Sequence, residues 1–543
     1  MNYNGKSNIT PAQPKAVFKT MIRAYGIGWA ATTVPAISSL LFRIILNRQQ
    51  DNKSRLACIQ KACLVTLPHI LKDSILRNGF PLLLAGALSG HHFLLQQQQL
   101  AQKSIANAFT QATTTATTEC VLNKYRDSKP SFVRLKSQKS AFFLSAFISF
   151  CFVRRLFPSI KTLDLTLFAL VRAADVYAHR MYASPKSRQI VPEWILEYGN
   201  VGVFMLACAE IMYTWFYRPQ KLPRSYARWI TDMAGIDERL KAFLRMVKHN
   251  EIVYGKDTGL SHFLYNYCDE LKLPRSFGDP LTGRVHCAVA HEGSRWGCEV
   301  NALSRFLKGF KKIFTVNLFL HFAPLLFFRT KQLVHNPSRW IVHALIATVR
   351  SSAFLGTFIA IIWYCVCLIR TRIGYRLLKI PQQNLDSVAP LIGSMLCGLS
   401  LLIESKHRRG EMVLYVVPRA LFSFMERMLP QRMKTGFMAE VIENIVFSAS
   451  VRVLLAAMYH DTAMVRPSIR GLLSWILKDE IKQQLQVHAD GENAIADDAS
   501  SDVETLGMSS KCEGEKEEDV DSEEEEAEIE IHLEILKRKK VAH

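Results

Sequence analysis

SSAFLGTFIAIIWYCVCLI, at residues 351–369, is a run without a charged side chain between Arg350 and Arg370. A helix of about 20 apolar residues is long enough to cross the hydrocarbon core of a bilayer. Four further runs of this kind, one of them interrupted by Glu210, lie at residues 24–42, 78–102, 198–217 and 387–403. The sequence therefore predicts an all-α, polytopic integral membrane protein.

Five weaker candidate spans are short or contain an Arg or Asp. They lie at residues 140–153, 163–177, 313–328, 412–424 and 442–459. We expect at least three of them to cross, which gives eight to ten membrane helices in total. Basic residues flank nearly every run on both sides, so the positive-inside rule sets no orientation.

Charge is distributed unevenly along the chain. Residues 490–543 contain 19 acidic and 6 basic side chains, a net of −13, although the whole chain carries +21. The other Lys and Arg residues mostly lie at the ends of apolar runs, where they reach lipid headgroups. This pattern indicates membrane lipid as a partner and argues against nucleic acid. The acidic tail, nearly free of aromatic residues, is predicted to be disordered and available to protein partners.

Two stretches resemble each other at a constant offset of 247 residues. They are TLFALVRAADVYAHR at 166–180 and VLYVVPRALFSFMER at 413–427, and they align Arg172 with Arg419. Further matches follow on both sides in the same order, so we interpret the likeness as an internal duplication rather than chance similarity among apolar helices. An odd number of spans per repeat gives inverted halves, and an even number gives parallel halves.

The duplication divides the chain into five parts. They are a polar N-terminus at 1–15, a first membrane half at 16–217, a connector at 218–311, a second membrane half at 312–487 and the acidic tail at 488–543. The polar N-terminus lacks the apolar core of a secretory signal. No sequence pattern sets an oligomeric state.

The connector contains an apolar stripe at helical spacing, formed by Met233, Ile236, Leu240, Phe243 and Val247. Such a helix either lies on the membrane surface or packs against the rest of the connector. Both alternatives remain open from the sequence.

Further along the connector, Cys287, His291 and Cys298 could supply three ligands to zinc. The spacing is not that of a common zinc finger, and the sequence offers no obvious fourth ligand. We therefore favour a structured loop with buried Cys and His side chains, and predict no cofactor. Cysteines inside the apolar runs, Cys367 among them, are interpreted as small hydrophobic residues.

Charged residues within or at the ends of the candidate spans are functional candidates. They are Arg172, Asp175, Glu210, Arg419 and Arg452. A charge at the bilayer centre costs about 2.5–3.5 kcal/mol on insertion scales, so such a group faces a cavity, pairs with a partner or reaches the headgroups. Arg172 and Asp175 are three residues apart and could pair on one helix face.

Small residues at a spacing of four predict close helix packing in two of the runs. They are Gly86 with Gly90, and Ala389 with Gly393. The sequence contains no phosphate-binding loop, nucleophile elbow, metalloprotease motif or dinucleotide fingerprint. We therefore predict no catalytic residues and no enzymatic activity.

The second half resembles the transmembrane protein 135 family. The likeness is carried by SSAFLG at 351–356 and by SVAPLIGSMLCGLSLLIESKHRRGEMVLYVVPRALFSFME at 387–426. The Cys/His segment of the connector is also similar, although Glu292 stands where the family often has Pro. The paired helices with small residues are distantly similar to the mitochondrial import translocase channel family.

The resemblance implies a multi-pass protein of the peroxisomal membrane, or alternatively the mitochondrial membrane, with a role in lipid homeostasis. It implies no catalytic residues. From it and from the embedded Arg residues we expect lipid handling or transport, with an anionic substrate such as a fatty-acid carboxylate or a lipid headgroup. The alternative is a scaffold for organelle dynamics or protein import that uses the tail and connector as docking sites.

Overall fold

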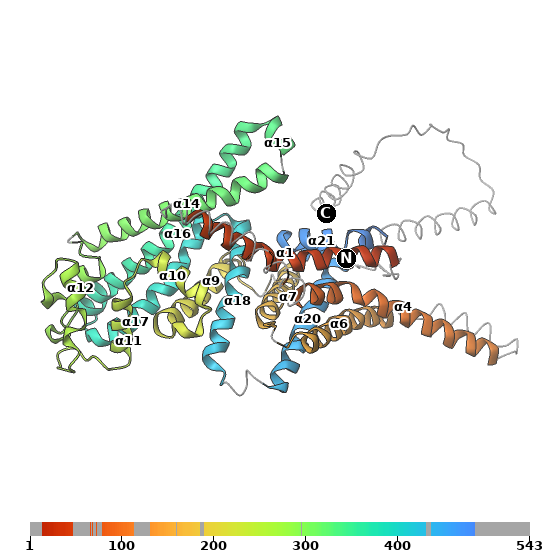
Figure 1. The fold of residues 1–543 in the computed structure, drawn as a ribbon, viewed down its shortest axis with the longest axis horizontal. Helices are drawn as coiled ribbons and strands as arrows, with labels where there is room; N and C mark the ends of the chain where they lie inside the picture. Colours follow the sequence, from red (N-terminus) through yellow and green to blue (C-terminus); the bar gives the residue numbers. More distant parts are fainter. Residues whose placement is uncertain are drawn as a thin grey trace. The chain divides into compact units, whose positions relative to one another are not determined.

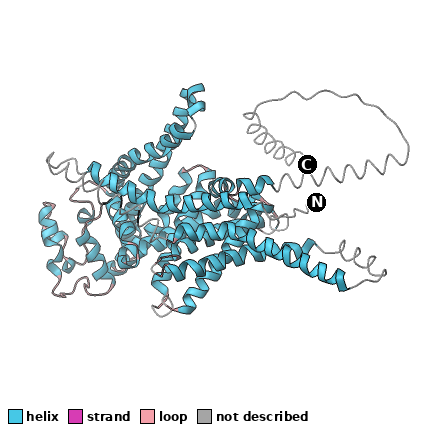
Figure 2. Cartoon of the chain, turned by 45° about the vertical axis from the view of Figure 1, so that its right-hand side comes forward, coloured by secondary structure: helices cyan, strands magenta, loops and turns pink. Residues whose placement is uncertain are grey.

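The fold is described here from a computed structural model. It describes residues 14–46, 79–112, 131–158, 160–184, 191–294, 296–328, 330–430 and 436–483, with a few isolated positions besides. These segments form helices and loops and contain no strand (Figure 2). The chain divides into the units Met1–Gln484 and Leu485–His543. The predicted disordered tail and most of the polar N-terminus lie outside the described residues.

The first 217 residues contribute five long helices to the described structure (Figure 1). They are α1 (Pro14–Leu46), α4 (Phe80–Ala112), α6 (Ser131–Leu156), α7 (Leu163–Ala183) and α9 (Glu193–Tyr217). The connector then folds into short helices rather than an open linker. They are η3 (Pro219–Lys221), α10 (Arg224–Ala234), α11 (Glu238–Lys248), η4 (Ser261–Leu264), α12 (Tyr265–Glu270), η5 (Arg275–Phe277), η6 (Pro280–Thr282) and α13 (Cys287–Ala290).

Long helices resume at the end of the connector. They are α14 (Cys298–Phe328), α16 (Pro337–Leu368) with its π-helical continuation η7 (Ile369–Leu377), α17 (Gln382–Leu396) with the 3₁₀ segment η8 (Cys397–Ile403), α18 (Lys406–Met428) and α20 (Phe437–His460). The short helix α15 (Thr330–His335) joins α14 to α16, and η9 (Thr462–Met464) and α21 (Pro467–Ile476) follow α20. Pro337 and Pro467 stand in the first turns of their helices, where the missing N–H has no intrahelical partner to lose.

In the part of the chain that the structure describes, four helices are long and apolar enough to cross a membrane. They cover Glu193–Tyr217, Pro337–Leu377, Gln382–Ile403 and Phe437–His460. They contain the predicted runs at 198–217, 351–369, 387–403 and 442–459. The runs at 24–42 and 78–102 lie in α1 and α4, which are helical but not among these four. The four helices fit a membrane-embedded protein, and their number is below the predicted eight to ten because several predicted spans, such as α7 and α18, contain too many charges.

Buried apolar side chains form two cores, and each core combines distant parts of the chain. One core joins α9 and the connector with α16, η8 and α18. The other joins α1, α4, α6 and α7 with α20 and α21. Helix α9 packs against α17 and α18, whereas α20 packs against α6 and α7. The last long helix before the connector therefore lies among later helices, and α20 lies among the early ones.

The apolar stripe of the connector is buried in protein. Leu240, Phe243 and Val247 are buried in the core that contains α9 and α16, and α11 contacts α17 and α9. The stripe is not one helix, because α10 ends at Gly235, whose φ of +58° is the left-handed conformation that favours glycine. The stripe therefore packs within the protein, against the long helices as well as against the rest of the connector.

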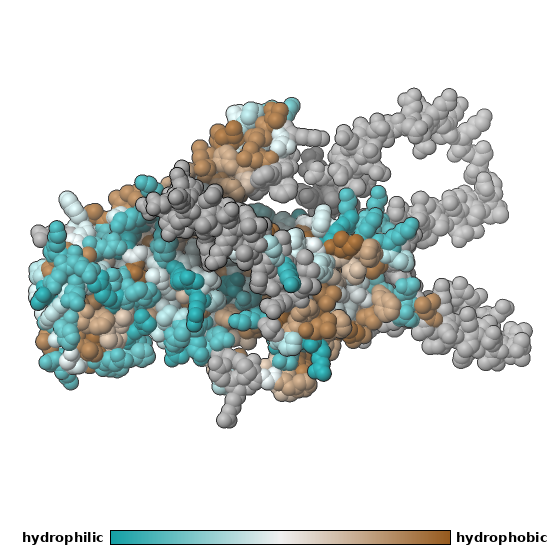
Figure 3. Space-filling view, viewed as in Figure 1, coloured by the Kyte–Doolittle hydropathy of each residue, from teal (hydrophilic) through white to brown (hydrophobic). Residues whose placement is uncertain are grey.

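Large apolar side chains are exposed on the long helices. Figure 3 shows apolar side chains gathered where α14 and α16 approach α15. Phe319 is 70% exposed, and Leu320, Val334 and Val342 are also exposed there. Apolar patches of this kind on a helical surface suit contact with hydrocarbon rather than water.

Candidate functional site

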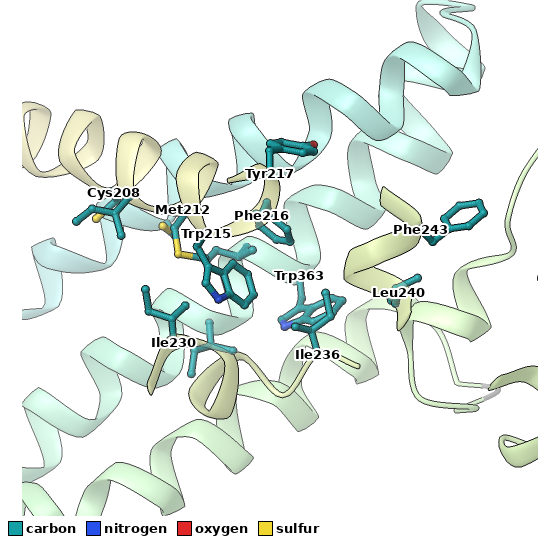
Figure 4. Close-up of a cluster of buried hydrophobic side chains, with 14 of the residues drawn as sticks. Cys208, Met212, Trp215, Phe216, Tyr217, Ile230, Ile236, Leu240, Phe243 and Trp363 are labelled. Carbon is teal, nitrogen blue, oxygen red and sulfur yellow. The ribbon is translucent and has the colours of Figure 1, made fainter. Parts of the chain in front are cut away.

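A cavity of about 930 Å³ lies between α9, α10, α14, α16 and α18. We call it the interhelical cavity. Its apolar wall includes Trp215 and Phe216 of α9, Ile230 of α10 and Trp363 of α16. Figure 4 shows these rings and aliphatic side chains converging from separate helices. Small-molecule sites in proteins occupy roughly 300–1,000 Å³ and have mostly apolar walls with a few polar groups, so the cavity has the size and character of a ligand site.

Helix α18 supplies a polar wall to the same cavity. Arg408, Glu411, Tyr415 and Arg419 line it, and they recur every three or four residues, which places them on one helix face. Arg408 Nη1 donates to Ser351 Oγ at 2.7 Å. The side chains of Arg408 and Arg419 are each more than a third exposed, and a guanidinium has five N–H donors, so each can bind a ligand as well.

Two ion pairs join α7 to α18, the helices that contain the two similar stretches. Arg172 Nη1 lies 2.9 Å from Glu411 Oε2, and Arg419 Nη1 lies 3.2 Å from Asp164 Oδ2. The offset of 247 that aligns Arg172 with Arg419 also aligns Asp164 with Glu411. The two ion pairs are therefore equivalent under the alignment, because exchanging each residue for its aligned counterpart turns one pair into the other. Moving eight residues forward on α7 moves the contact eight residues back on α18, so the two helices run antiparallel.

The three remaining charged candidates, Asp175, Glu210 and Arg452, differ in their surroundings. Asp175 does not pair with Arg172 and instead accepts hydrogen bonds from Arg466 at 2.9 and 3.0 Å. That prediction was wrong because the partner across the interface outcompetes the neighbour on the same helix. Glu210 accepts from Arg427 Nε at 3.1 Å. Arg452 is exposed on α20.

The predicted packing residues lie at helix contacts. A Cβ added to Gly86 would collide with Ser149 of α6, and one at Gly90 would meet Ser145 at 3.4 Å. At Gly393 it would lie 3.1 Å from the carbonyl oxygen of Ile362. Ala389 is fully buried. These positions allow α4 to approach α6, and α17 to approach α16.

A second candidate site lies where the connector meets α16. Cys287, His291 and Cys298 come together there with Cys367, and their four ligand atoms all lie within 4.8 Å of one another. The sequence identified the first three residues. It missed Cys367, which we had interpreted as a small hydrophobic residue, because the helix that contains it is apolar around it. The available signal was weak: Cys367 lies three residues before Arg370, at the end of the apolar run.

A third polar cluster, which the sequence analysis missed, is buried in the core formed by the early helices and α20. His92 Nε2 lies 2.8 Å from Glu480 Oε2, and Tyr459 donates to the same oxygen at 2.7 Å. The ring of His91 lies against that of His92, with the ring centres 4.0 Å apart, and both residues are almost fully buried. The His-His pair in the apolar run at 78–102 was the signal that could have drawn attention to it.

Hydrogen bonds and ion pairs fasten the connector to α16 and α17. Arg370 Nη2 donates to the carbonyl of Val285 at 3.2 Å and pairs with buried Asp386. Within the connector, hydrogen bonds from Arg239 hold the pKa of Asp237 and that of Glu270 below their usual values. The connector is therefore a folded part of the first unit and positions side chains beside the interhelical cavity.

The arrangement around the cavity suits the binding of a ligand. Its polar residues are held in ion pairs and hydrogen bonds along one helix face, while its walls offer apolar surface for a hydrocarbon chain. No family model, no curated protein and no solved structure matches this chain.

Proposed function

We propose that this chain is a multi-pass membrane protein that binds an amphipathic lipid in the interhelical cavity and handles that lipid within or across the membrane. The observation that carries the proposal is the cavity itself, which has a mostly apolar wall and the partly exposed side chains of Arg408 and Arg419. An acyl chain fits the apolar body. A carboxylate or phosphate fits the guanidinium donors, which form two parallel hydrogen bonds to such groups.

The arginine donors of the polar wall narrow the class of lipid. The wall as a whole is neutral, since Arg408 and Arg419 contribute two positive charges and Glu411 and Asp164 contribute two negative charges. Asp164, the partner of Arg419, is 53% exposed, so an anionic headgroup can share or displace it at that guanidinium. We therefore infer a fatty acid or an anionic lipid with a small headgroup.

Lateral entry from the bilayer suits this lipid. The helices that line the cavity also expose large apolar side chains, such as Leu206 of α9 and Phe319 of α14. A lipid that leaves the hydrocarbon phase between such helices keeps its chain in apolar surroundings along the whole path. Entry therefore requires no transfer of the acyl chain through water, which would cost about 0.8 kcal/mol for each CH₂ group.

The duplication adds support for two related halves that face opposite ways. The reciprocal pairs Arg172–Glu411 and Arg419–Asp164 are what a two-fold axis between α7 and α18 would produce. Because these helices run antiparallel, the axis lies across them, as in transporters with inverted repeats. Such proteins bind their substrates at the interface of the repeats, and the interhelical cavity lies between α9 of the first half and α16 and α18 of the second.

The membrane in which this function takes place remains a proposal from the resemblance to the transmembrane protein 135 family. We propose the peroxisomal membrane, with the mitochondrial membrane as the alternative. Imaging of a tagged full-length chain against markers of both organelles tests this. A secretory or plasma-membrane pattern would contradict both locations.

Photolabelling tests the lipid proposal. The full chain in lipid nanodiscs is irradiated with a long-chain fatty acid that carries a diazirine, and labelled peptides are identified by mass spectrometry. We expect labels on α9, α16 or α18 at cavity residues. Leu355→Trp fills the cavity and should abolish this labelling, and the pair Arg408→Gln and Arg419→Gln should reduce it severalfold.

Leu345→Trp is the matched control, because Leu345 lies on the same helix α16 but is exposed and does not line the cavity. This variant should label as the unaltered chain does. Labels confined to outward-facing residues, unchanged by Leu355→Trp, would contradict lipid binding in the cavity. That outcome would favour the scaffold alternative.

A further inference from the structure

Four potential metal ligands meet at the contact between the connector and α16. Cys287 begins α13, His291 directly follows it, Cys298 begins α14, and Cys367 lies one residue before the end of α16. The Nε2 atom of His291 is 3.2 Å from the Sγ atom of Cys367. The four ligand atoms lie within 4.8 Å of one another.

The donor set and its dimensions fit one metal closely. Zinc takes four ligands in a tetrahedron at about 2.3 Å from sulfur and about 2.0–2.1 Å from nitrogen, which separates the ligand atoms by roughly 3.3–3.8 Å. The cluster therefore needs to contract by about 1 Å or less to close around the ion. Three sulfur ligands and one imidazole exclude Ca²⁺ and Mg²⁺, which prefer oxygen.

The chain between the ligands is shaped to return Cys298 to the cluster. Glu292 and Gly293 both adopt left-handed backbone conformations, with φ of +55° and +80°. The N–H of Gly293 donates to the carbonyl of Ala288 at 3.0 Å, and the N–H of His291 donates to that of Cys287 at 2.9 Å. The loop therefore folds back on α13 and presents three ligands from twelve residues to the fourth on α16.

The surroundings of the cluster also suit a thiolate-rich metal site. Three thiolates, a neutral imidazole and Zn²⁺ carry a net charge of −1. Arg370, which is almost fully buried and three residues beyond Cys367, lies close enough to interact electrostatically with Cys287 and Cys367. His291 is buried.

We propose that Cys287, His291, Cys298 and Cys367 bind one Zn²⁺ ion in a structural site that fastens the connector to α16. The site is closed, because the protein supplies all four ligands and leaves no position for a substrate. It links a loop of the connector to a helix about 70 residues later in the chain. The inference does not depend on the proposed lipid function, because the ligands lie outside the interhelical cavity.

Metal analysis of the purified full chain tests the proposal. The protein is expressed with zinc available, purified in detergent without chelator, and analysed by inductively coupled plasma mass spectrometry. We expect about one zinc per chain. Cys367→Ala and His291→Ala should each lower the zinc content severalfold.

Cys365→Ala is the matched control, since Cys365 lies two residues away on α16 and is not part of the cluster. This variant should retain the zinc of the unaltered chain. Because a ligand variant that fails to fold would also lose zinc, a second measurement uses the unaltered protein. After chelation, added Co²⁺ should produce the visible bands of a tetrahedral cobalt–thiolate site, and Zn²⁺ should abolish them.

Three results would overturn the assignment. The first is unaltered protein that contains no zinc and gives no cobalt bands. The second is a disulfide between two of the three cysteines in the protein as purified. The third is iron with acid-labile sulfide in place of zinc, which would assign the same residues to an iron–sulfur cluster.

Discussion

The carboxylate of Asp386 connects Tyr254 of the connector to Arg370 at the end of α16. We predict that replacing Asp386 by Asn destabilises the protein. The side chain of Asp386 is fully buried, and that of Arg370 is 9% exposed. Oδ1 accepts from Arg370 Nε and from Gln382 at 3.0 Å, while Oδ2 accepts from Arg370 Nη2 at 3.2 Å and from the hydroxyl of Tyr254. All four bonds use the carboxylate as acceptor, so either orientation of an Asn amide places its NH₂ group against donors.

The magnitude follows from the burial of the pair. Removing one partner of a buried ion pair costs about 3–5 kcal/mol, because the remaining charge has no compensation. At about 2.1 cal/mol/K per residue, the unfolding entropy of the unit Met1–Gln484 is about 1 kcal/mol/K. Dividing the lost free energy by this entropy predicts that Asp386→Asn lowers the melting temperature by about 3–5 °C. Replacing both residues, as in Arg370→Met with Asp386→Leu, should recover much of this loss.

Tryptophan fluorescence during heating of the detergent-purified chain measures these shifts. Asp232→Asn is the matched control, because Asp232 pairs with Lys312 at 2.8 Å but is 68% exposed. It should change the melting temperature by no more than about 1 °C, since exposed pairs contribute about 0–1 kcal/mol. Equal shifts for the two Asp→Asn variants would refute the argument that this carboxylate is buried and paired.

Two further predictions follow from ion pairs of unequal burial and from shifted pKa values. Arg172→Gln should lower the free energy of unfolding by about 3 kcal/mol, and Arg419→Gln by about 1 kcal/mol or less. The reason is burial, since the side chain of Arg172 is 9% exposed and that of Arg419 is 37% exposed. Equal melting temperatures for the two variants would contradict this. Arg239→Gln should lower the melting temperature at neutral pH, and the difference from the unaltered chain should shrink below about pH 4, where Asp237 and Glu270 of the unfolded chain become protonated. The sign is set by their lowered pKa values in the folded protein, and a difference that grows on acidification would exclude this mechanism.

Helices could be predicted from the sequence because their cause is local. The charge-free run at 351–369 lies in α16, and the runs at 198–217 and 387–403 also became long apolar helices. The helical class of the chain follows from these runs. The number of spans was harder to predict, since segments such as α7 combine apolar length with charges that only find partners after folding.

Partners across the fold could not be predicted, because no local pattern records them. Asp175 is three residues from Arg172, yet its partner Arg466 lies 291 residues away. Cys367 has the same difficulty, since the three other members of its cluster precede it by about 70 residues or more. The two similar stretches were the exception, because their constant offset of 247 residues also relates both members of the Arg–acid pairs.

The run at 351–369 contributes residues to both proposed sites, the interhelical cavity and the thiol cluster. Helix α16 places Ser351 at the polar wall of the interhelical cavity and Trp363 in its apolar wall. Further along, it places Cys367 in the thiol cluster, and its continuation η7 places Arg370 at the carbonyl of Val285 in the connector. Trp363 and Cys367 are four residues apart, so they lie on the same helix face about one turn from each other. A shift of α16 at the thiol cluster would therefore also move Trp363 in the cavity wall. We expect the shape of that wall to depend both on the groups that fasten the connector to this helix and on connector residues, such as Ile230, that line the cavity directly.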